Sequence, residues 1–231
     1  MPLLAYLLYR NEAVADADFV EHYRAVHSPL SVEAMPLQTF YAANVARPGA
    51  ASTAPWGSRR PPVDALAFVG FEDVDVLADP DRLYASVELG ERLNADGAYL
   101  FSGMDGYVVD TELAWGSPRT WPTGQASPGL QHITLACRRS GVSAATFRDR
   151  LRSLAAATSC AVSSDALGGA LHVVTGTVSP DAPALDAILE QRWTTSADGA
   201  AALASVEAAL AELCDADATR TVVADQTIWI D

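Results

Sequence analysis

The stretch PLLAYLLYR, residues 2–10, begins the pattern that decides the fold. Its apolar run has the length of a buried strand, and apolar side chains then recur at helical spacing from about residue 16. In the rest of the first half we expect strands at 37–47 and 63–72, a helical region at about 73–95 and a strand at 103–115. This order, β-α-β-β-α-β, is typical of a ferredoxin-like unit.

The second part of the chain repeats the same order of signals. A strand is expected at 130–139, followed by a helix that Ser143 caps and that ends near residue 157. Two strands, an Ala-rich helix and a last strand follow, at 170–178, 184–194, 197–213 and 219–230. The spacing of Arg10 and Phe19 equals that of Arg138 and Phe147, which indicates a duplication.

Residues 116–128, GSPRTWPTGQASP, have the composition of a linker and separate two halves, 1–115 and 129–231. A ferredoxin-like unit carries helices on only one face of its sheet, so the other face must be covered. We therefore expect an α+β fold in which the two halves pack sheet to sheet as an intrachain α+β barrel. Its lumen would suit a small ligand.

The charged residues exclude several classes of function. The formal net charge is −14, and all 15 basic residues are Arg, with no Lys in the chain. Schiff-base catalysis, pyridoxal-phosphate attachment, biotinylation and a Walker-type phosphate loop require a Lys amine, so these are excluded. The excess of negative charge argues against nucleic acid and anionic membranes as partners.

Cysteine usage and motif content suggest a cytoplasmic protein without a cofactor. Cys137, Cys160 and Cys214 are odd in number and far apart, which favours a reducing compartment over a disulfide framework. The first apolar run is too short for a signal peptide or a membrane span. No GxGxxG, HExxH or paired Cys/His spacing occurs, so we expect neither a cofactor nor a metal.

Alternation along the strands predicts which side chains face the lumen. We place Tyr6, His132 and Thr134 toward it, because the opposite face of the same strands is more uniformly apolar and should pack on helices. An error of one residue in register would invert this assignment. Glu190 and Arg192 share one strand face, where they would contact substrate, pair with each other or meet solvent.

Two further features each leave alternatives open. His172 is a lone imidazole in an apolar strand, and it fits a satisfied buried histidine as well as a functional one. The segment 47–62 is longer than a turn requires, and Trp56, Arg59 and Arg60 would close over an anionic or aromatic ligand unless the segment is only a solvated loop.

The segment FVEHYRAVHSPL, residues 19–30, carries the most specific signal. Phe19, Tyr23 and His27 are spaced four apart and share one helix face. Ser28 and Pro29 predict the start of a new helix segment and a bend of the backbone. The spacing alone fits a buried structural histidine, and the proton affinity of imidazole near neutral pH also suits acid–base work.

This segment resembles the EthD family of the dimeric α/β-barrel superfamily, whose helix carries Phe, then Trp or Tyr, then His at intervals of four, followed by x-Pro-Leu. Phe19, Tyr23, His27, Pro29 and Leu30 match this pattern. The likeness covers roughly residues 3–112 and continues through Tyr41, Asn44, Asp64, Phe71 and 95–112. Members of the family act in ether degradation or in decarboxylation, cyclisation or oxidation of aromatic polyketides.

The resemblance implies that His27 is the catalytic or substrate-polarising group, with Tyr41, Asn44 and Asp64 near it. The second half departs from the motif, because Ala155 aligns with His27 and no Pro-Leu follows. We therefore expect one site per chain. The chain would be a monomeric pseudo-dimer or would form a homodimer.

We expect a cofactor-independent enzyme that acts on a hydrophobic aromatic or polyketide-like molecule by acid–base chemistry: cyclisation, dehydration or decarboxylation. His27, Asp64 and Tyr41 would be catalytic. The substrate would contact Tyr6, Tyr23, Asn44, Phe68, His132, Glu190, Arg192 and Trp56. The alternatives are a cofactor-free monooxygenase or oxidase, a non-catalytic carrier of an apolar ligand, and haem chemistry through an axial His.

Overall fold

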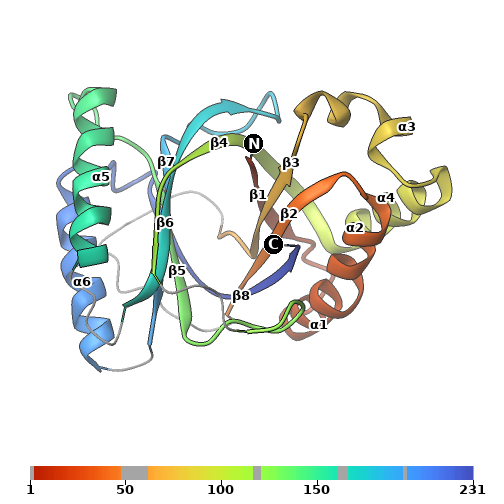
Figure 1. Cartoon of the computed structure of the whole chain (residues 1–231), viewed down its shortest axis with the longest axis horizontal. Coiled ribbons are helices and arrows are strands. Elements are labelled where there is room, and N and C mark those ends of the chain that lie inside the picture. Colours follow the sequence, from red (N-terminus) through yellow and green to blue (C-terminus); the bar gives the residue numbers. More distant parts are fainter. Residues whose placement is uncertain (1–2, 48–61, 117–120, 161–165, 195–196, 231) are drawn as a thin grey trace.

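Eight antiparallel strands close into one barrel with helices on two opposite sides (Figure 1). The computed structural model describes residues 3–47, 62–116, 121–160, 166–194 and 197–230. The strands follow the order β1-β3-β2-β8-β5-β7-β6-β4 around the barrel. This arrangement confirms the expected α+β barrel.

The two halves have the same element order and the same strand order. The first half contains β1 (Leu3–Arg10), α1 (Asp16–His22), a π-helical segment η1 (Tyr23–His27), α2 (Ser28–Ala34), β2 (Gln38–Ala46), β3 (Ala65–Phe71), a 3-10 helix η2 (Val74–Ala78), α3 (Pro80–Leu83), α4 (Val87–Leu100) and β4 (Phe101–Gly116). The second contains β5 (Leu130–Ala136), α5 (Ala144–Cys160), β6 (Ala166–Thr177), β7 (Ala187–Trp193), α6 (Ala197–Ala211) and β8 (Arg220–Ile230).

The halves join edge to edge, β2 to β8 and β4 to β6, which closes the barrel and leaves it without a free edge. Helices α1 to α4 cover the outside of the first half, and α5 and α6 cover the outside of the second (Figure 1). The common origin of the halves and their boundaries stay predictions. In the part of the chain that the structure describes, no helix has the length and apolar character needed to cross a membrane.

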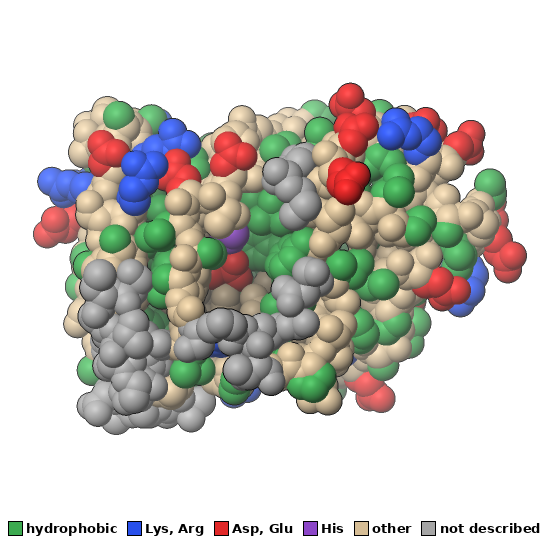
Figure 2. All heavy atoms as spheres, in the orientation of Figure 1, with side chains coloured by type: hydrophobic (Ala, Val, Ile, Leu, Met, Phe, Trp, Pro, Cys, Tyr) green, Lys and Arg blue, Asp and Glu red, His purple; other side chains and the backbone are tan. Residues whose placement is uncertain are grey.

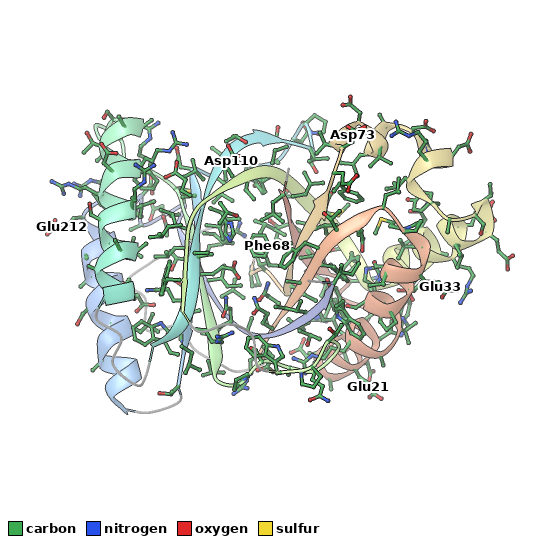
Figure 3. All side chains as sticks on the ribbon, in the orientation of Figure 1. Glu21, Glu33, Phe68, Asp73, Asp110 and Glu212 are labelled. Carbon is green, nitrogen blue, oxygen red and sulfur yellow. The ribbon has the colours of Figure 1, made fainter. Side chains whose placement is uncertain are left out.

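The predicted inward face of the strands was wrong. Leu4 and Leu8, on the face of Tyr6, pack with the helices of the first half, whereas Ala5 and Leu7 belong to the cluster inside the barrel. Phe68, which pairs with Ala5 on the inner face, lies between the two halves (Figure 3). Both faces of these strands are buried, so the apolar content of a face does not show which one is inside.

The same inversion applies to β5. Ile133 and Leu135 lie in the interior cluster, whereas Ala136 belongs to the cluster under α5 and α6. His132 and Thr134 alternate with the interior residues and therefore point outward, toward the helices of the second half. On β5 the more apolar of the two faces is therefore the one that lines the barrel interior.

The helix that carries His27 continues without the predicted break. Ser28 is helical, with φ −65° and ψ −46°, and its N–H bonds to the carbonyl of Tyr23 five residues earlier. This π-helical turn widens the helix just before Pro29, whose ring would otherwise clash with a carbonyl of the preceding turn. The Ser28 hydroxyl does not cap the helix. It accepts a hydrogen bond from the Tyr41 hydroxyl at 3.3 Å instead.

The entry into β5 depends on Gly129. Its φ is +80°, and a Cβ atom there would lie 2.3 Å from the carbonyl oxygen of Trp193 on the neighbouring strand. Gly141 provides a matched control, because its φ is +87° but a Cβ would meet nothing within 4 Å. We expect Gly141→Ala to lower the free energy of unfolding by about 1 kcal/mol, from backbone strain alone.

Gly129→Ala should lower the free energy of unfolding by about 3 kcal/mol, because overpacking against the Trp193 carbonyl adds to the backbone strain. Urea denaturation of the two variants measures the difference. Equal losses for both variants would show that the close approach of β5 to β7 is not needed for stability.

Candidate active site

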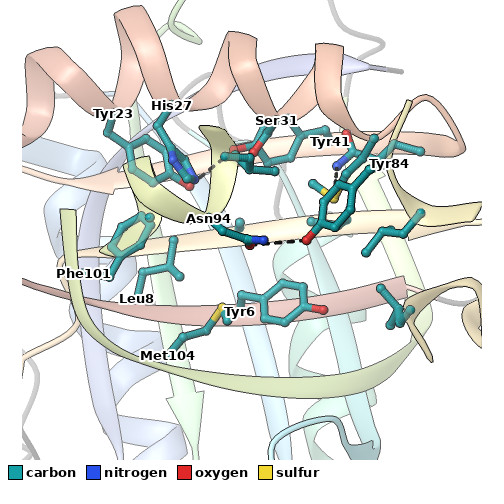
Figure 4. Close-up of a pocket in the computed structure, with 18 of the residues that line it drawn as sticks. Tyr6, Leu8, Tyr23, His27, Ser31, Tyr41, Tyr84, Asn94, Phe101 and Met104 are labelled. Carbon is teal, nitrogen blue, oxygen red and sulfur yellow. Dashed lines mark hydrogen bonds between the residues drawn. The ribbon is translucent and has the colours of Figure 1, made fainter. Parts of the chain in front are cut away.

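A cavity of about 550 Å³ lies between the outer face of the first-half strands and the helices that cover them. Its walls are mainly apolar and aromatic, and Figure 4 shows Tyr23 and His27 on one side with Tyr6 and Met104 across from them. The volume is within the roughly 300–1,000 Å³ of small-molecule sites. The cavity is outside the barrel, and not in the lumen where a small ligand was expected.

His27 is held in one orientation by its neighbours. Its Nδ1 lies 2.8 Å from Oδ2 of Asp96, a residue of α4. The imidazole packs edge-on against the Phe101 ring, with ring centroids 5.0 Å apart. It also packs against the tilted ring of Tyr23, with ring centroids 5.2 Å apart. The other oxygen of Asp96 is 2.6 Å from Nε2 of His22, so this carboxylate joins two histidines of the same helical stretch.

The carboxylate determines which nitrogen of His27 can act as a base. A carboxylate only accepts hydrogen bonds, so in the neutral imidazole Nδ1 carries the proton and donates to Asp96. Nε2 then has the free lone pair and is available to the cavity that His27 lines. Burial lowers the pKa of His27 below its usual 6.5, although Asp96 opposes this shift. His27 is therefore a neutral base at pH 7.

Tyrosine hydroxyls supply the polar part of the cavity wall. Burial raises the pKa of Tyr6 to about 12, and burial also raises the pKa of Tyr23 and of Tyr41. The Tyr23 and Tyr41 hydroxyls are 3.4 Å apart. These phenols stay neutral. The Tyr6 hydroxyl can donate a hydrogen bond to a carbonyl or phenolate oxygen of a bound molecule, whereas the Tyr41 hydroxyl already donates to Ser28.

The cavity therefore combines four of the predicted catalytic and substrate-contacting residues: Tyr6, Tyr23, His27 and Tyr41. Asp64 is not among them. It lies just before the start of β3, where its Oδ2 accepts a hydrogen bond of 2.8 Å from the backbone N–H of Arg10 and its carboxylate pairs with the Arg10 guanidinium. The structure thus does not bring Asp64 to His27 and gives it a local structural role.

The remaining candidates lie elsewhere. Asn44, Phe68, Glu190 and Arg192 are on the inner face of the barrel strands. His132 faces the helices of the second half, and burial lowers its pKa to about 4. Trp56, and with it the predicted lid at 47–62, falls almost entirely outside the described residues.

Asp96 is the residue of this candidate site that sequence reasoning missed. It lies 69 positions after His27, so no spacing rule connects the two. A signal was present in the segment 95–112, which begins with Ala95-Asp96-Gly97 and belongs to the stretch of EthD likeness. Gly97, in the same stretch, also lines the cavity. Within the described ranges, no three His, Cys, Asp or Glu side chains are placed to hold a metal ion.

Comparison with known proteins supports the fold. No protein-family model and no curated protein sequence matches the chain, so the EthD resemblance stays a prediction. An anthrone oxidase-like protein of known structure aligns with 100% of this chain and 93% of its own, with a TM-score of 0.60 and 7% identity.

Two candidate monooxygenases have the same architecture. The Lactobacillus acidophilus structure has a TM-score of 0.53 at 8% identity over 98% of this chain and 95% of its own. The Fusobacterium nucleatum structure has a TM-score of 0.55 at 8% identity over 99% of this chain and 92% of its own. The chain is thus an α+β protein in which a single polypeptide forms a closed eight-stranded barrel, the fold that it shares with these structures.

Proposed function

We propose that the protein is an enzyme that binds a hydrophobic aromatic or polyketide-like molecule in the helix–sheet cavity and removes a proton from it with His27. The observation that carries this proposal is the Asp96–His27 pair in a cavity walled by neutral tyrosines. Nε2 of His27 would take a proton from an acidic C–H or phenol O–H of the substrate. The Tyr6 hydroxyl would donate a hydrogen bond to the oxygen on which negative charge develops.

Acid–base chemistry without an external oxidant is the leading class: cyclisation, dehydration or decarboxylation. Proton abstraction yields an enolate or phenolate, and Nε2–H of His27 can return its proton to a leaving hydroxyl or to carbon. Asp96 stabilises the imidazolium formed in between, because its carboxylate is 2.8 Å from Nδ1. This sequence of steps uses only groups that the chain provides.

Cofactor-free oxidation is the second candidate, and the structural likeness to an anthrone oxidase-like protein favours it. Its first step is the same abstraction of a proton by His27. The resulting carbanion would transfer electrons to dioxygen, and an anthrone would become a quinone with release of one water. The apolar walls of the cavity would exclude bulk water from such an intermediate.

The two classes are separated by incubating the purified protein with anthrone and with a panel of aromatic β-polyketones, in air and under nitrogen. Mass spectrometry of the products is the measurement. We expect turnover that persists under nitrogen; turnover only in air would assign the oxidase reaction. Stoichiometric binding of the panel without any product would contradict an enzymatic function and indicate a carrier. A Soret band of the purified protein would instead indicate haem chemistry.

A further inference from the structure

The barrel interior contains a group of polar side chains that the helix–sheet cavity does not use. Cross-strand pairing places Asn44 beside Leu66, and it places Gln131 beside Ala224. Leu66 and Ala224 belong to the interior cluster, so both amides are on the inner face. Figure 2 shows a hollow in the middle of this side of the molecule, with a histidine and an acidic side chain in its wall.

Glu190 is at the centre of this polar group. Its Oε2 accepts hydrogen bonds from Nε2 of Gln131 at 2.8 Å and from Nε2 of Gln226 at 3.4 Å. Its Oε1 lies 2.7 Å from Nε2 of His172. The carboxylate makes Nε2 the donor, so Nδ1 of a neutral His172 accepts from the Thr111 hydroxyl at 2.9 Å.

Two buried acceptors remain unused. Oδ1 of Asn44, a residue with 0% exposure, and Oε1 of Gln131, with 4% exposure, have no hydrogen-bond partner among the residues that the structure describes. One N–H of each amide is already engaged, that of Asn44 with the Leu66 carbonyl at 3.2 Å and that of Gln131 with Glu190. Buried polar atoms in folded proteins almost always have a partner. These two oxygens therefore point to a group with donors that occupies the interior.

We propose that the barrel interior is a second binding site, for a small neutral molecule with two hydrogen-bond donors, such as a dihydric phenol or a diol. Each amide uses one N–H within the network and Nε2–H of His172 donates to Glu190, so the two unpaired oxygens, Oδ1 of Asn44 and Oε1 of Gln131, set the requirement for a ligand with two donors. Phe68, whose ring centroid is 4.7 Å from that of His172, supplies the apolar surface.

The wall that His172 and Glu190 form is buried, because their side chains retain only 5% and 8% exposure. The site is separate from the catalytic cavity, because alternate residues of the same strands face the two spaces. It does not depend on the proposed function of His27.

Side-chain amide NMR of ¹⁵N-labelled full-length protein tests the proposal, with resorcinol as probe and 1,3-dimethoxybenzene as the matched compound without donors. We expect saturable shifts of the Asn44 and Gln131 amide resonances with resorcinol. The dissociation constant of 1,3-dimethoxybenzene should be higher than that of resorcinol by about tenfold or more. Unchanged resonances, or equal shifts with both compounds, would show that only water fills the interior and would overturn the proposal.

Substitutions localise the binding. Asn44→Ala and Gln131→Met should each weaken resorcinol binding by about tenfold, because each removes one acceptor. Thr134→Val is the control, since it changes the same strand as Gln131 on the outer face. His27→Gln should leave binding to the interior intact, which distinguishes this site from the catalytic cavity. If Asn44→Ala and Gln131→Met both bind resorcinol as tightly as the wild type, the assignment of these two acceptors to the site is wrong. If a variant fails to fold, the comparison of resorcinol with 1,3-dimethoxybenzene on the wild-type protein still tests the proposal.

Discussion

His27→Gln should reduce kcat for the substrate identified in the panel by roughly 10²–10⁴-fold, the usual contribution of a positioned general base. Glutamine keeps a polar side chain at the position but cannot take up a proton. The cavity walls stay in place, so substrate affinity should change by no more than a few-fold. Steady-state kinetics and equilibrium binding together measure the two effects.

His132→Gln is the matched control for this variant. His132 is also partly buried, but it faces the helices of the second half and does not line the cavity. Its substitution should leave kcat unchanged. Equal activity of the His27 and His132 variants would remove His27 from the mechanism.

Asp96→Asn should reduce kcat by about 10²-fold and move the acid limb of the pH–rate profile to lower pH. In the wild type, burial lowers the pKa of His27 while Asp96 raises it. Activity requires the neutral imidazole, so the wild-type acid limb should lie below the usual His pKa of 6.5. Without the carboxylate, protonation of His27 is still less favourable, and the rate falls because the imidazolium intermediate loses its counter-charge.

The measurement is kcat/KM against pH for the wild type and the variant. Asp110→Asn is the control, because Asp110 is exposed on β4 and does not line the cavity. If the acid limb of the pH–rate profile lies at the same pH in Asp96→Asn as in the wild type, His27 is not the base whose titration limits the rate. A rate equal to that of the wild type would mean that the 2.8 Å contact has no part in catalysis.

Much of the architecture could be predicted from local patterns. Strand-length apolar runs and helical spacing predicted the β-α-β-β-α-β order of both halves, and Ser143 caps α5 as expected, accepting from the Thr146 N–H at 3.1 Å. The helical spacing of Phe19, Tyr23 and His27 placed the imidazole on a buried helix face. The π-helical turn could not be predicted, because the missing N–H of Pro29 permits either a new helix segment or a widened turn.

The candidate site was predictable only in part. Tyr6, Tyr23, His27 and Tyr41 meet in one cavity, but the side of the sheet on which they meet was inverted. Asp64 was carried over from a resemblance and lies with Arg10 instead. The Asp96 contact comes from α4 packing against the helix of His27, and contacts between distant segments leave no periodic trace in a sequence.

The sequence by itself determined the order of elements, the closure of two similar halves into a barrel and the presence of a histidine on a buried helix face. The tertiary structure alone decided which face of each strand is inside. Alternation has a period of two and separates the faces of a strand, but it distinguishes inside from outside only when one face is exposed. Here the lumen and the helices bury both faces, so packing decided that the interior holds the Glu190 network while His27 and Asp96 meet outside the barrel.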